Sequence, residues 1–345
     1  MIQSPLNYMG GKFKLLPQIL PLFPKNINTF VDLFCGGCNV GINIDCERVI
    51  YNDLDKNLLY LYNTFKNLDK QSVFEWIYEI INTYNLSLVS EKGYDYYRCD
   101  SSKGLGNYNK ENFLRLRADF NEKKKKGNYD YYYYVMLYVI IVYAFNNQIR
   151  FNSNGEFNLP VGKRDFNKKM QQKLSDFIDI IKEQNCKFTC LDFREFDIDT
   201  LGNNDFVYVD PPYLITCATY NEQGGWSETD EKDLLKFLDS LNGKKMRFAL
   251  SNVLRSKGKE NTILIEWLDK NKDKYRVVNL NYSYSNSNYQ TKDKTSNSEE
   301  VLITNYWGGA RWLQRYRIKL FVGVWERPVS ERKILIRLLR NNFSY

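Results

Sequence analysis

Asp210-Pro211-Pro212-Tyr213 places a carboxylate, two prolines and a phenol ring directly after an apolar run, residues 206–209. The bounded apolar run predicts a buried strand of a parallel sheet. Asp210 then lies at the carboxyl end of that strand, where open α/β sheets bind ligands. The prolines stiffen the turn, so Asp210 and Tyr213 are held in fixed directions that suit a planar base with an exocyclic amine. Taken alone, the same residues also fit a plain strand end capped by an aspartate.

A second group of residues, near the amino terminus, has the spacing of a nucleoside site. A predicted strand at 30–34 leads into the glycine-rich turn 35–41, and a second predicted strand at 49–51 is followed by Asp53. An acidic residue there can hold ribose hydroxyls over the glycine turn. Because the turn lacks the G-x-G-x-x-G pattern of a pyrophosphate site, NAD and FAD fit poorly. A nucleoside cofactor without a diphosphate fits better, and S-adenosylmethionine is the candidate.

Residues 145–160 carry many amide side chains and Arg150 on both sides of a Ser-Asn-Gly turn, which predicts a β-hairpin near 149–159. Amide and guanidinium groups form paired hydrogen bonds to adenine and guanine edges, and the lysines and arginine that follow suit phosphates. A polar surface hairpin without such a role is the alternative. The candidate DNA-binding residues are Asn147, Arg150, Asn152, Asn154, Lys163 and Arg164.

Composition excludes several classes of protein. The 345 residues contain no histidine, so histidine-based acid–base chemistry and Ser-His-Asp triads are excluded. The net charge of +8 is concentrated in residues 307–345, where nine Lys or Arg accompany two Glu. Basic charge helps a protein to approach nucleic acid, although it more often marks a solvated face. The tail is either a DNA-contacting arm or a terminus without a role.

Seven scattered cysteines argue against a disulfide framework. Cys35, Cys38, Cys186 and Cys190 could be combined into a zinc site, but the first two belong to the glycine turn, so we expect no metal. The longest uncharged apolar stretch, 131–145, is shorter than a bilayer span, and no signal-peptide pattern opens the sequence. We therefore expect a cytoplasmic protein without a membrane segment.

Helix and strand signals alternate before about residue 58 and after Asp210, and a mainly helical stretch separates them. The lysine run 123–126 in that stretch is more typical of a solvated loop than of a functional patch. The polar stretch 282–298 predicts a loop near the site. After Asp210 the expected elements are a helix from 228 to 241 opened by a capping box, a strand at 247–250 ended by Ser251-Asn252, a helix at 262–269, and strands at 276–280 and 301–303.

With these residues in this order, the chain resembles the DNA adenine methylase (Dam) family, of the alpha class. Residues 3–306 carry the resemblance, and Cys38 departs from it because the family's F-x-G-x-G motif ends in glycine. The resemblance implies transfer of a methyl group from S-adenosylmethionine to N6 of an adenine flipped out of duplex DNA. The motifs are Asn7-Tyr8-Met9-Gly10-Gly11-Lys12, Phe34-Cys35-Gly36, Asp53, the Asp210 to Tyr213 motif, the hairpin 146–162 and the closing strand 300–305.

The resemblance also implies roles for single residues. Asp210 and the carbonyl of Pro211 would accept the two N6 hydrogens, while Tyr213 stacks on the flipped base. Arg150 and Asn152 are candidate readers of a GATC-like site. The implied cofactor-binding residues are Tyr8, Gly10, Lys12, Phe34, Gly36, Asp53 and Asp210.

The implied architecture is a Rossmann-like methyltransferase sheet, residues 1–60 and 166–306, with an inserted, mainly helical target-recognition domain, residues 61–165. Residues 307–345 form a basic extension outside the resemblance. The expected partners are double-stranded DNA and a cognate restriction endonuclease that acts on the same site, for a monomer in a bacterial or phage-like setting. The alternatives are transfer to cytosine N4 or to an RNA adenine, and a catalytically silent DNA-binding relative.

Overall fold

The computed structural model describes residues 1–8, 10–216, 225–281 and 298–307. Met9 and Cys217 lie outside this part of the chain. The expectations for the polar loop 282–298 and the basic extension 307–345 also fall outside it, apart from Ser298 and Trp307.

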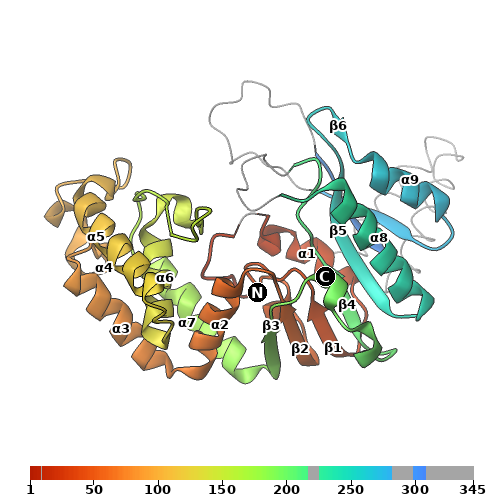
Figure 1. Ribbon diagram of the computed structural model, residues 1–345, viewed down its shortest axis with the longest axis horizontal. Helices are drawn as coiled ribbons and strands as arrows, with labels where there is room; N and C mark the ends of the chain where they lie inside the picture. The colour runs from red at the N-terminus through yellow and green to blue at the C-terminus, as the bar shows by residue number, and fades with distance from the viewer. Residues whose placement is uncertain (9, 217–224, 282–297, 308–345) are drawn as a thin grey trace, which may run out of the picture.

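Seven strands form one mixed, mostly parallel sheet in the order β3-β2-β1-β4-β5-β8-β7 (Figure 1). The order reverses between β1 and β4, which places a ligand-binding crevice at their carboxyl ends. Strand β8 runs antiparallel to both of its neighbours, and the short β6 pairs with β5 outside this order. The strands are β1 (Ile27–Asp32), β2 (Cys46–Asn52), β3 (Cys186–Thr189), β4 (Phe206–Val209), β5 (Arg247–Ser256), β6 (Lys259–Glu260), β7 (Arg276–Leu280) and β8 (Glu299–Thr304).

The sheet is buried on both faces because alternate strand residues enter two separate cores. Phe30 and Tyr208 belong to the core that includes α1, α2 and α7, whereas Val31 and Val207 belong to the core under α8 and α9. This burial explains the continuous apolar runs of the central strands. The helices are α1 (Leu16–Ile19), α2 (Lys56–Asn67), α3 (Lys70–Thr83), α4 (Val89–Tyr96), α5 (Gly106–Lys125), α6 (Tyr131–Tyr143), α7 (Lys168–Glu183), α8 (Glu228–Gly243) and α9 (Thr262–Lys270).

Helices α2 to α6 lie together at one end of the sheet (Figure 1). Three of them, α2, α3 and α6, follow side-chain caps, because Asp55, Asp69 and Asp130 each accept a backbone N–H of the first turn. The expected boundary at 60/61 falls inside α2, which packs on both α6 and α7 and therefore joins the helical region to the sheet. Helix α6 is buried around nearly its whole circumference. No helix in the described part of the chain combines the length and apolarity that a bilayer crossing needs.

Several expected elements are confirmed, including β4 at 206–209, β7 at 276–280 and the capping box of α8. The expected end of the 247 strand at Ser251-Asn252 is wrong, because β5 continues to Ser256. Both polar side chains are satisfied inside the protein: the Ser251 hydroxyl contacts the Tyr208 hydroxyl at 2.7 Å, and Asn252 donates to Glu231. Paired polar groups therefore allow the strand to remain in the core.

Two further expectations need correction. The lysine run 123–126 is not a loop, because its first three residues form the last turn of α5. Cations are favourable at the carboxyl end of a helix, where the backbone carbonyls carry partial negative charge. The helix-like stretch expected after the glycine turn is only a single 3₁₀ turn, Gly41–Asn43, before β2 begins.

Candidate active site

Asp210 follows the last residue of β4 and lies at the switch point of the sheet. Its side chain is 17% exposed, and its Oδ1 accepts a hydrogen bond from the Tyr213 hydroxyl at 3.0 Å. Pro211 is buried and Pro212 is exposed. The turn thus brings the carboxylate and the phenol ring together.

Lys12 is the third member of this group. Its ammonium is 2.9 Å from Asp210 Oδ1, 3.9 Å from Glu300 Oε1 and 4.9 Å from the centre of the Tyr213 ring. The same ammonium donates to the carbonyl of Gly10 at 2.8 Å, and only 4% of the side chain is exposed. The family resemblance implies a cofactor-binding role for Lys12, and the structure places its ammonium against the Asp210 carboxylate.

Burial controls the ionisation of the carboxyl groups around the crevice. Desolvation raises the pKa of Asp210, while the Lys12 ammonium and the Tyr213 hydroxyl act in the opposite direction. At the end of β1, burial raises the pKa of Asp32 to about 8 despite the hydrogen bond that it accepts from the Gly41 N–H. Lys12 therefore favours a charged Asp210 in a setting that disfavours charge.

The glycine turn after β1 is shaped by Tyr8. Gly36 has a φ of +43°, and a Cβ atom there would lie 2.7 Å from two ring carbons of Tyr8. The N–H of Gly36 donates to Asp53 Oδ2 at 2.8 Å, and its carbonyl accepts from the Tyr62 hydroxyl at 2.7 Å. The turn, Tyr8 and the acid after β2 thus form one connected unit.

Cys38 lies where the family motif has glycine, and its φ of +59° explains that preference. The left-handed region costs a residue with a Cβ about 1–2 kcal/mol. The Cys38 side chain is fully buried, so its packing offsets part of this cost. The motif keeps its backbone path despite the substitution.

Asn52 is a structural residue that the sequence patterns did not single out. Its buried amide donates to the carbonyls of Leu33 and Leu191, at 3.0 Å each, and its oxygen accepts from the Leu191 N–H at 3.1 Å. These bonds join the ends of three adjacent strands. A polar residue at the end of an otherwise apolar strand was the only available signal.

Phe193 and Trp226 were also missed. With Phe34 they form an aromatic cluster beside the glycine turn, with ring centres 5.7–5.9 Å apart. Two of these rings come from loops at the carboxyl edge of the sheet, and Trp226 precedes α8. Phe193 belongs to the core under α8, and the half-buried Phe34 and Trp226 pack against that core.

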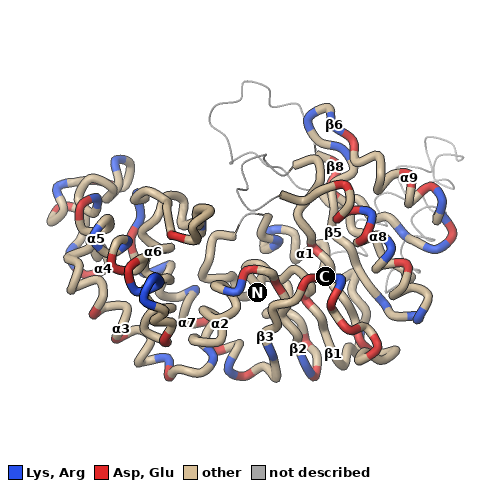
Figure 2. The backbone as a smooth tube through the Cα atoms, viewed as in Figure 1, with Lys and Arg blue, Asp and Glu red and all other residues tan. Residues whose placement is uncertain are grey.

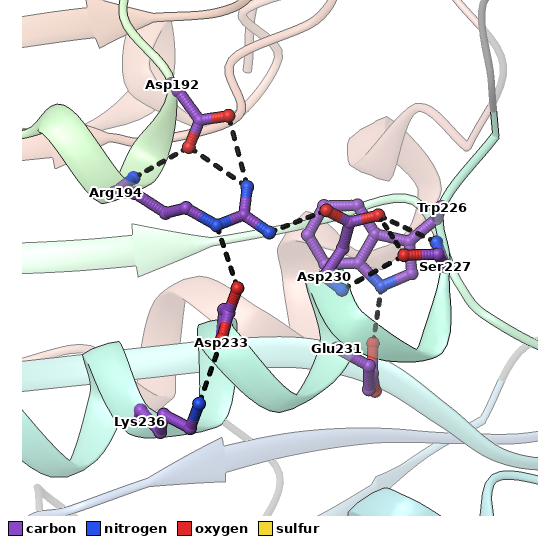
Figure 3. Close-up of polar contacts among 8 residues, drawn as sticks. All are labelled: Asp192, Arg194, Trp226, Ser227, Asp230, Glu231, Asp233 and Lys236. Carbon is purple, nitrogen blue, oxygen red and sulfur yellow. Dashed lines mark hydrogen bonds and ion pairs between the residues drawn. The ribbon is translucent and has the colours of Figure 1, made fainter.

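Arg194 fastens this edge to the start of α8 (Figure 3). Its guanidinium contacts Asp230 at 2.6 Å, Asp233 at 3.1 Å and Asp192 at 3.2 Å. Asp230 also accepts from Ser227 in the capping box, and Trp226 donates to Glu231 at 2.6 Å. The loop that carries Phe193 and the segment that carries Trp226 are therefore held together.

The candidate DNA-binding residues divide into two groups in the structure. Arg150, Asn154, Lys163 and Arg164 are exposed, and the Arg150 guanidinium also donates across the hairpin to Asn158 Oδ1 at 2.7 Å. The chain does turn back on itself at 152–156, with an antiparallel bridge between Phe151 and Phe157.

Asn147 and Asn152 instead make bonds that shape the backbone. Asn147 donates to the carbonyl of Val142 at the end of α6. Asn152 closes the turn, because its oxygen accepts the N–H of Glu156 at 2.8 Å and its own N–H donates to the Glu156 carbonyl at 2.9 Å. In this structure the Asn152 amide is occupied within the hairpin.

Charges of both signs are interspersed over the helical region and over α8 and α9 (Figure 2). In the described part of the chain, no three Cys, Asp or Glu side chains come together as metal ligands. The described cysteines, including those imagined as a zinc set, are free.

A mostly parallel seven-strand sheet with a glycine turn after β1, an acid after β2 and Asp210 after β4 is consistent with a methyltransferase fold. The family model for D12 class N6 adenine-specific DNA methyltransferase matches residues 8–286. The chain belongs to this family.

Its relatives include "Type II methyltransferase M.FokI" of Planomicrobium okeanokoites, 42% identical over 311 residues, and "Modification methylase StsI" of Streptococcus sanguinis, 40% identical over 312 residues. Each alignment covers 88% of this chain and 43% of the relative, so the chain spans less than half the length of these proteins. A "DNA adenine methylase" of Salmonella typhi is 25% identical over 253 residues, which covers 72% of this chain and 79% of that protein.

Proposed function

We propose that this chain transfers a methyl group from S-adenosylmethionine to N6 of an adenine in duplex DNA, as the modification enzyme of a restriction–modification system. The family supports the reaction, and the names of two relatives, which call them a type II methyltransferase and a modification methylase, support the setting. The observation that carries the proposal is the contact of Lys12 and Tyr213 with one oxygen of Asp210 at the switch point.

The donors at this edge suit S-adenosylmethionine. Asp53, after β2, would hold the ribose hydroxyls, and the half-buried Phe34 and Trp226 offer an apolar surface to the adenine ring. The glycine turn lets the backbone approach this space closely, and the turn lacks the G-x-G-x-x-G pattern of a diphosphate site. The cofactor supplies an electrophilic methyl group.

Asp210 prepares the nucleophile. The N6 lone pair of adenine is delocalised into the ring, so the amino group reacts poorly until its hydrogens are drawn toward acceptors. Lys12 and Tyr213 both contact Oδ1, so Oδ2 is the oxygen that we assign to one N6 hydrogen, and the carbonyl of Pro211 takes the other. Both acceptors stabilise positive charge that develops on N6.

Tyr213 is the stacking partner for the base. An adenine inside the duplex cannot reach Asp210, so the base has to leave the helix, and an aromatic ring offsets part of the lost stacking. The bond from the Tyr213 hydroxyl to Asp210 fixes the orientation of the ring relative to the acceptor. Positioning of this kind supplies most of the rate when no dedicated base takes part.

The region 61–165 is the target-recognition part of this proposal. Of the two candidate base readers, Arg150 is exposed on the hairpin and Asn152 closes its turn, with exposed Asn154 beside it. Lys163 and Arg164 follow the hairpin as phosphate contacts. Asn7, in the cofactor segment, donates to the carbonyl of Asn146 at 2.8 Å and so links the two functions. A GATC-like target is the finer hypothesis.

Transfer of tritiated methyl from S-adenosylmethionine to unmethylated plasmid tests the reaction. Label recovered as N6-methyladenine is the expected result. Label in 4-methylcytosine, or label only when RNA is offered in place of the plasmid, would show that the substrate is not a DNA adenine. DNA binding without label would contradict catalysis. Digestion of the modified plasmid with methylation-sensitive nucleases then tests the GATC-like site.

A further inference from the structure

The second arm of the hairpin, after the turn, bonds to different partners along its two edges: the inner edge faces the first arm, and the outer edge faces α5. The inner edge joins the arms, through the N–H of Asn152 to the Glu156 carbonyl and the N–H of Asn158 to the Arg150 carbonyl, at 2.9 and 3.2 Å. In an extended segment, successive residues point their backbone N–H and C=O groups to opposite edges. Phe157 and Leu159 therefore present their carbonyls on the outer edge, and Gly155, with a φ of +72°, belongs to the turn before them.

Helix α5 meets this outer edge with polar side chains. Asn121 makes two bonds to one residue, since its amide donates to the Phe157 carbonyl at 3.1 Å and its oxygen accepts the Phe157 N–H at 2.9 Å. This is the pattern with which a neighbouring strand would pair. The complete ladder is Arg117 to the Leu159 carbonyl at 2.7 Å, Asn121 to Phe157, and Lys124 to the Gly155 carbonyl.

The two spacings match. Residues 117, 121 and 124 lie on one face of a helix, because side chains three and four positions apart are neighbours. Phe157 and Leu159 lie on one edge of the second arm, because an edge of an extended segment repeats every second residue, and Gly155 precedes them in the turn. A helix face of three side chains thus covers the edge that a third strand would occupy.

We propose that Asn121, flanked by Arg117 and Lys124, is a positioning residue that sets the register of the DNA-reading hairpin. A two-stranded hairpin is marginal alone and needs a third strand or a packed helix for stability. Further contacts support the same arrangement: Lys125 pairs with Glu156 at 2.9 Å, and the Phe157 ring is 1% exposed beneath the ladder.

The ladder bonds α5 to the backbone of the second arm, whereas Arg150 lies on the first arm, which α5 meets through Lys124, 5.1 Å from the centre of the Phe151 ring. Base recognition depends on the position of such side chains to within a fraction of an ångström, whereas phosphate attraction does not. Loss of the ladder should therefore weaken site discrimination more than general DNA binding. This inference rests on the proposed function, because it assumes that the hairpin reads DNA.

The test compares wild type with Asn121→Ala on a plasmid pool that carries randomised duplex sites, with N6-methyladenine located by sequencing. We expect the ratio of kcat/KM between the modified site and its single-base variants to fall about tenfold, while kcat at saturating DNA stays within about twofold. Asn112→Ala is the matched control, because Asn112 lies on the same helix and donates only to the Asn85 carbonyl, at 3.1 Å. Its ratio should equal that of wild type.

Asn121→Asp adds a readout that a merely structural residue would not give. An aspartate has an ordinary pKa near 4, and Arg117, Lys124 and Lys125 beside it favour its ionised form, so it can accept the Phe157 N–H but cannot donate to the Phe157 carbonyl. Discrimination by this variant should therefore be low, as in Asn121→Ala, while kcat at saturating DNA stays within about twofold of wild type. Retained kcat would separate register control from a general loss of folding.

The outcomes separate the two proposals. A wild-type protein that transfers no methyl group overturns the proposed function and this inference with it. An active wild type whose Asn121→Ala variant keeps its discrimination overturns the inference alone. So does an Asn121→Asp variant that discriminates as well as wild type.

Discussion

The reactive edge of the sheet and the hairpin after α6 are positioned by different means. At the sheet, Asp53 and Asp210 follow strands whose ladders fix the backbone, and a buried Asn52 ties three strand ends together. At the hairpin, few backbone bonds join the arms, and side chains of α5 supply the rest. The groups that we propose to react are thus placed by the sheet itself, and the groups that we propose to read DNA are placed by contacts between distant segments.

This difference predicts that chemistry and recognition can be changed separately. Variants at the sheet edge should change the rate of methyl transfer on any DNA. Variants at the hairpin should change the choice of DNA while the rate at saturation is kept. Each prediction below tests one side of that division.

Asp210→Ala should have the largest effect. Removal of an acceptor that interacts with the reacting amine should lower kcat by at least about 10³-fold. Calorimetric titration should still detect S-adenosylmethionine binding, because Asp53 and the glycine turn remain. Asp273→Ala, at an exposed aspartate, is the control. Turnover retained by Asp210→Ala would contradict the acceptor role.

Lys12→Met should move the acid side of the pH–rate profile. The Lys12 charge lowers the pKa of Asp210, so its removal raises that pKa further above the ordinary value. More of the carboxyl is then protonated at a given pH, and activity is lost at a higher pH as the solution is acidified. We expect kcat near neutrality to fall about tenfold.

The comparison for this variant is Lys25→Met, at an exposed lysine. A Lys12→Met profile that superimposes on wild type would show that Asp210 ionises independently of Lys12. A change in DNA site preference in Lys12→Met would also contradict the division between chemistry and recognition, because the sheet edge would then take part in recognition.

Arg150→Ala and Lys163→Ala test the hairpin side. Loss of a base-reading guanidinium should lower discrimination by about 1–3 kcal/mol at one position of the target. Loss of a phosphate contact should weaken all sequences alike and reduce the slope of log affinity against log salt by about 1. Single-turnover rates at saturating DNA should not change in either variant. If the two variants changed discrimination equally, the distinction between a base-reading residue and a phosphate-contacting residue would be wrong.

Arg194→Ala should have the smallest effect. The guanidinium is 36% exposed, so solvent screens its three ion pairs, and we expect the free energy of unfolding to fall by only about 1 kcal/mol. Cofactor affinity should weaken modestly as Phe193 and Trp226 loosen. Lys236→Ala, which removes an exposed lysine that contacts only Asp233, is the matched control in thermal unfolding. Identical stability of both variants would show that Arg194 does not fasten this edge.

Much of the reactive edge was predictable because its signals are local. Apolar runs ended by Asp53 or Asp210 defined strand ends, and Gly36 marked a turn whose positive φ a side chain would strain. The wrong predictions arose because only local signals can be read from the sequence. Ser251-Asn252 looked like a strand end because the bonds that satisfy these residues come from Tyr208 and Glu231, which are far away in the sequence.

The sequence by itself determined the strand and helix order, the acids at the strand ends and the family to which the chain belongs. Tertiary structure decided the partner of Lys12, the use of Asn152 to close its own turn, and the support of the hairpin by α5. The physical reason is the distance along the chain over which each interaction acts. Periodicity and turn chemistry act between neighbours, whereas a buried ion pair or a helix-to-arm ladder exists only after segments separated by tens of residues have packed together.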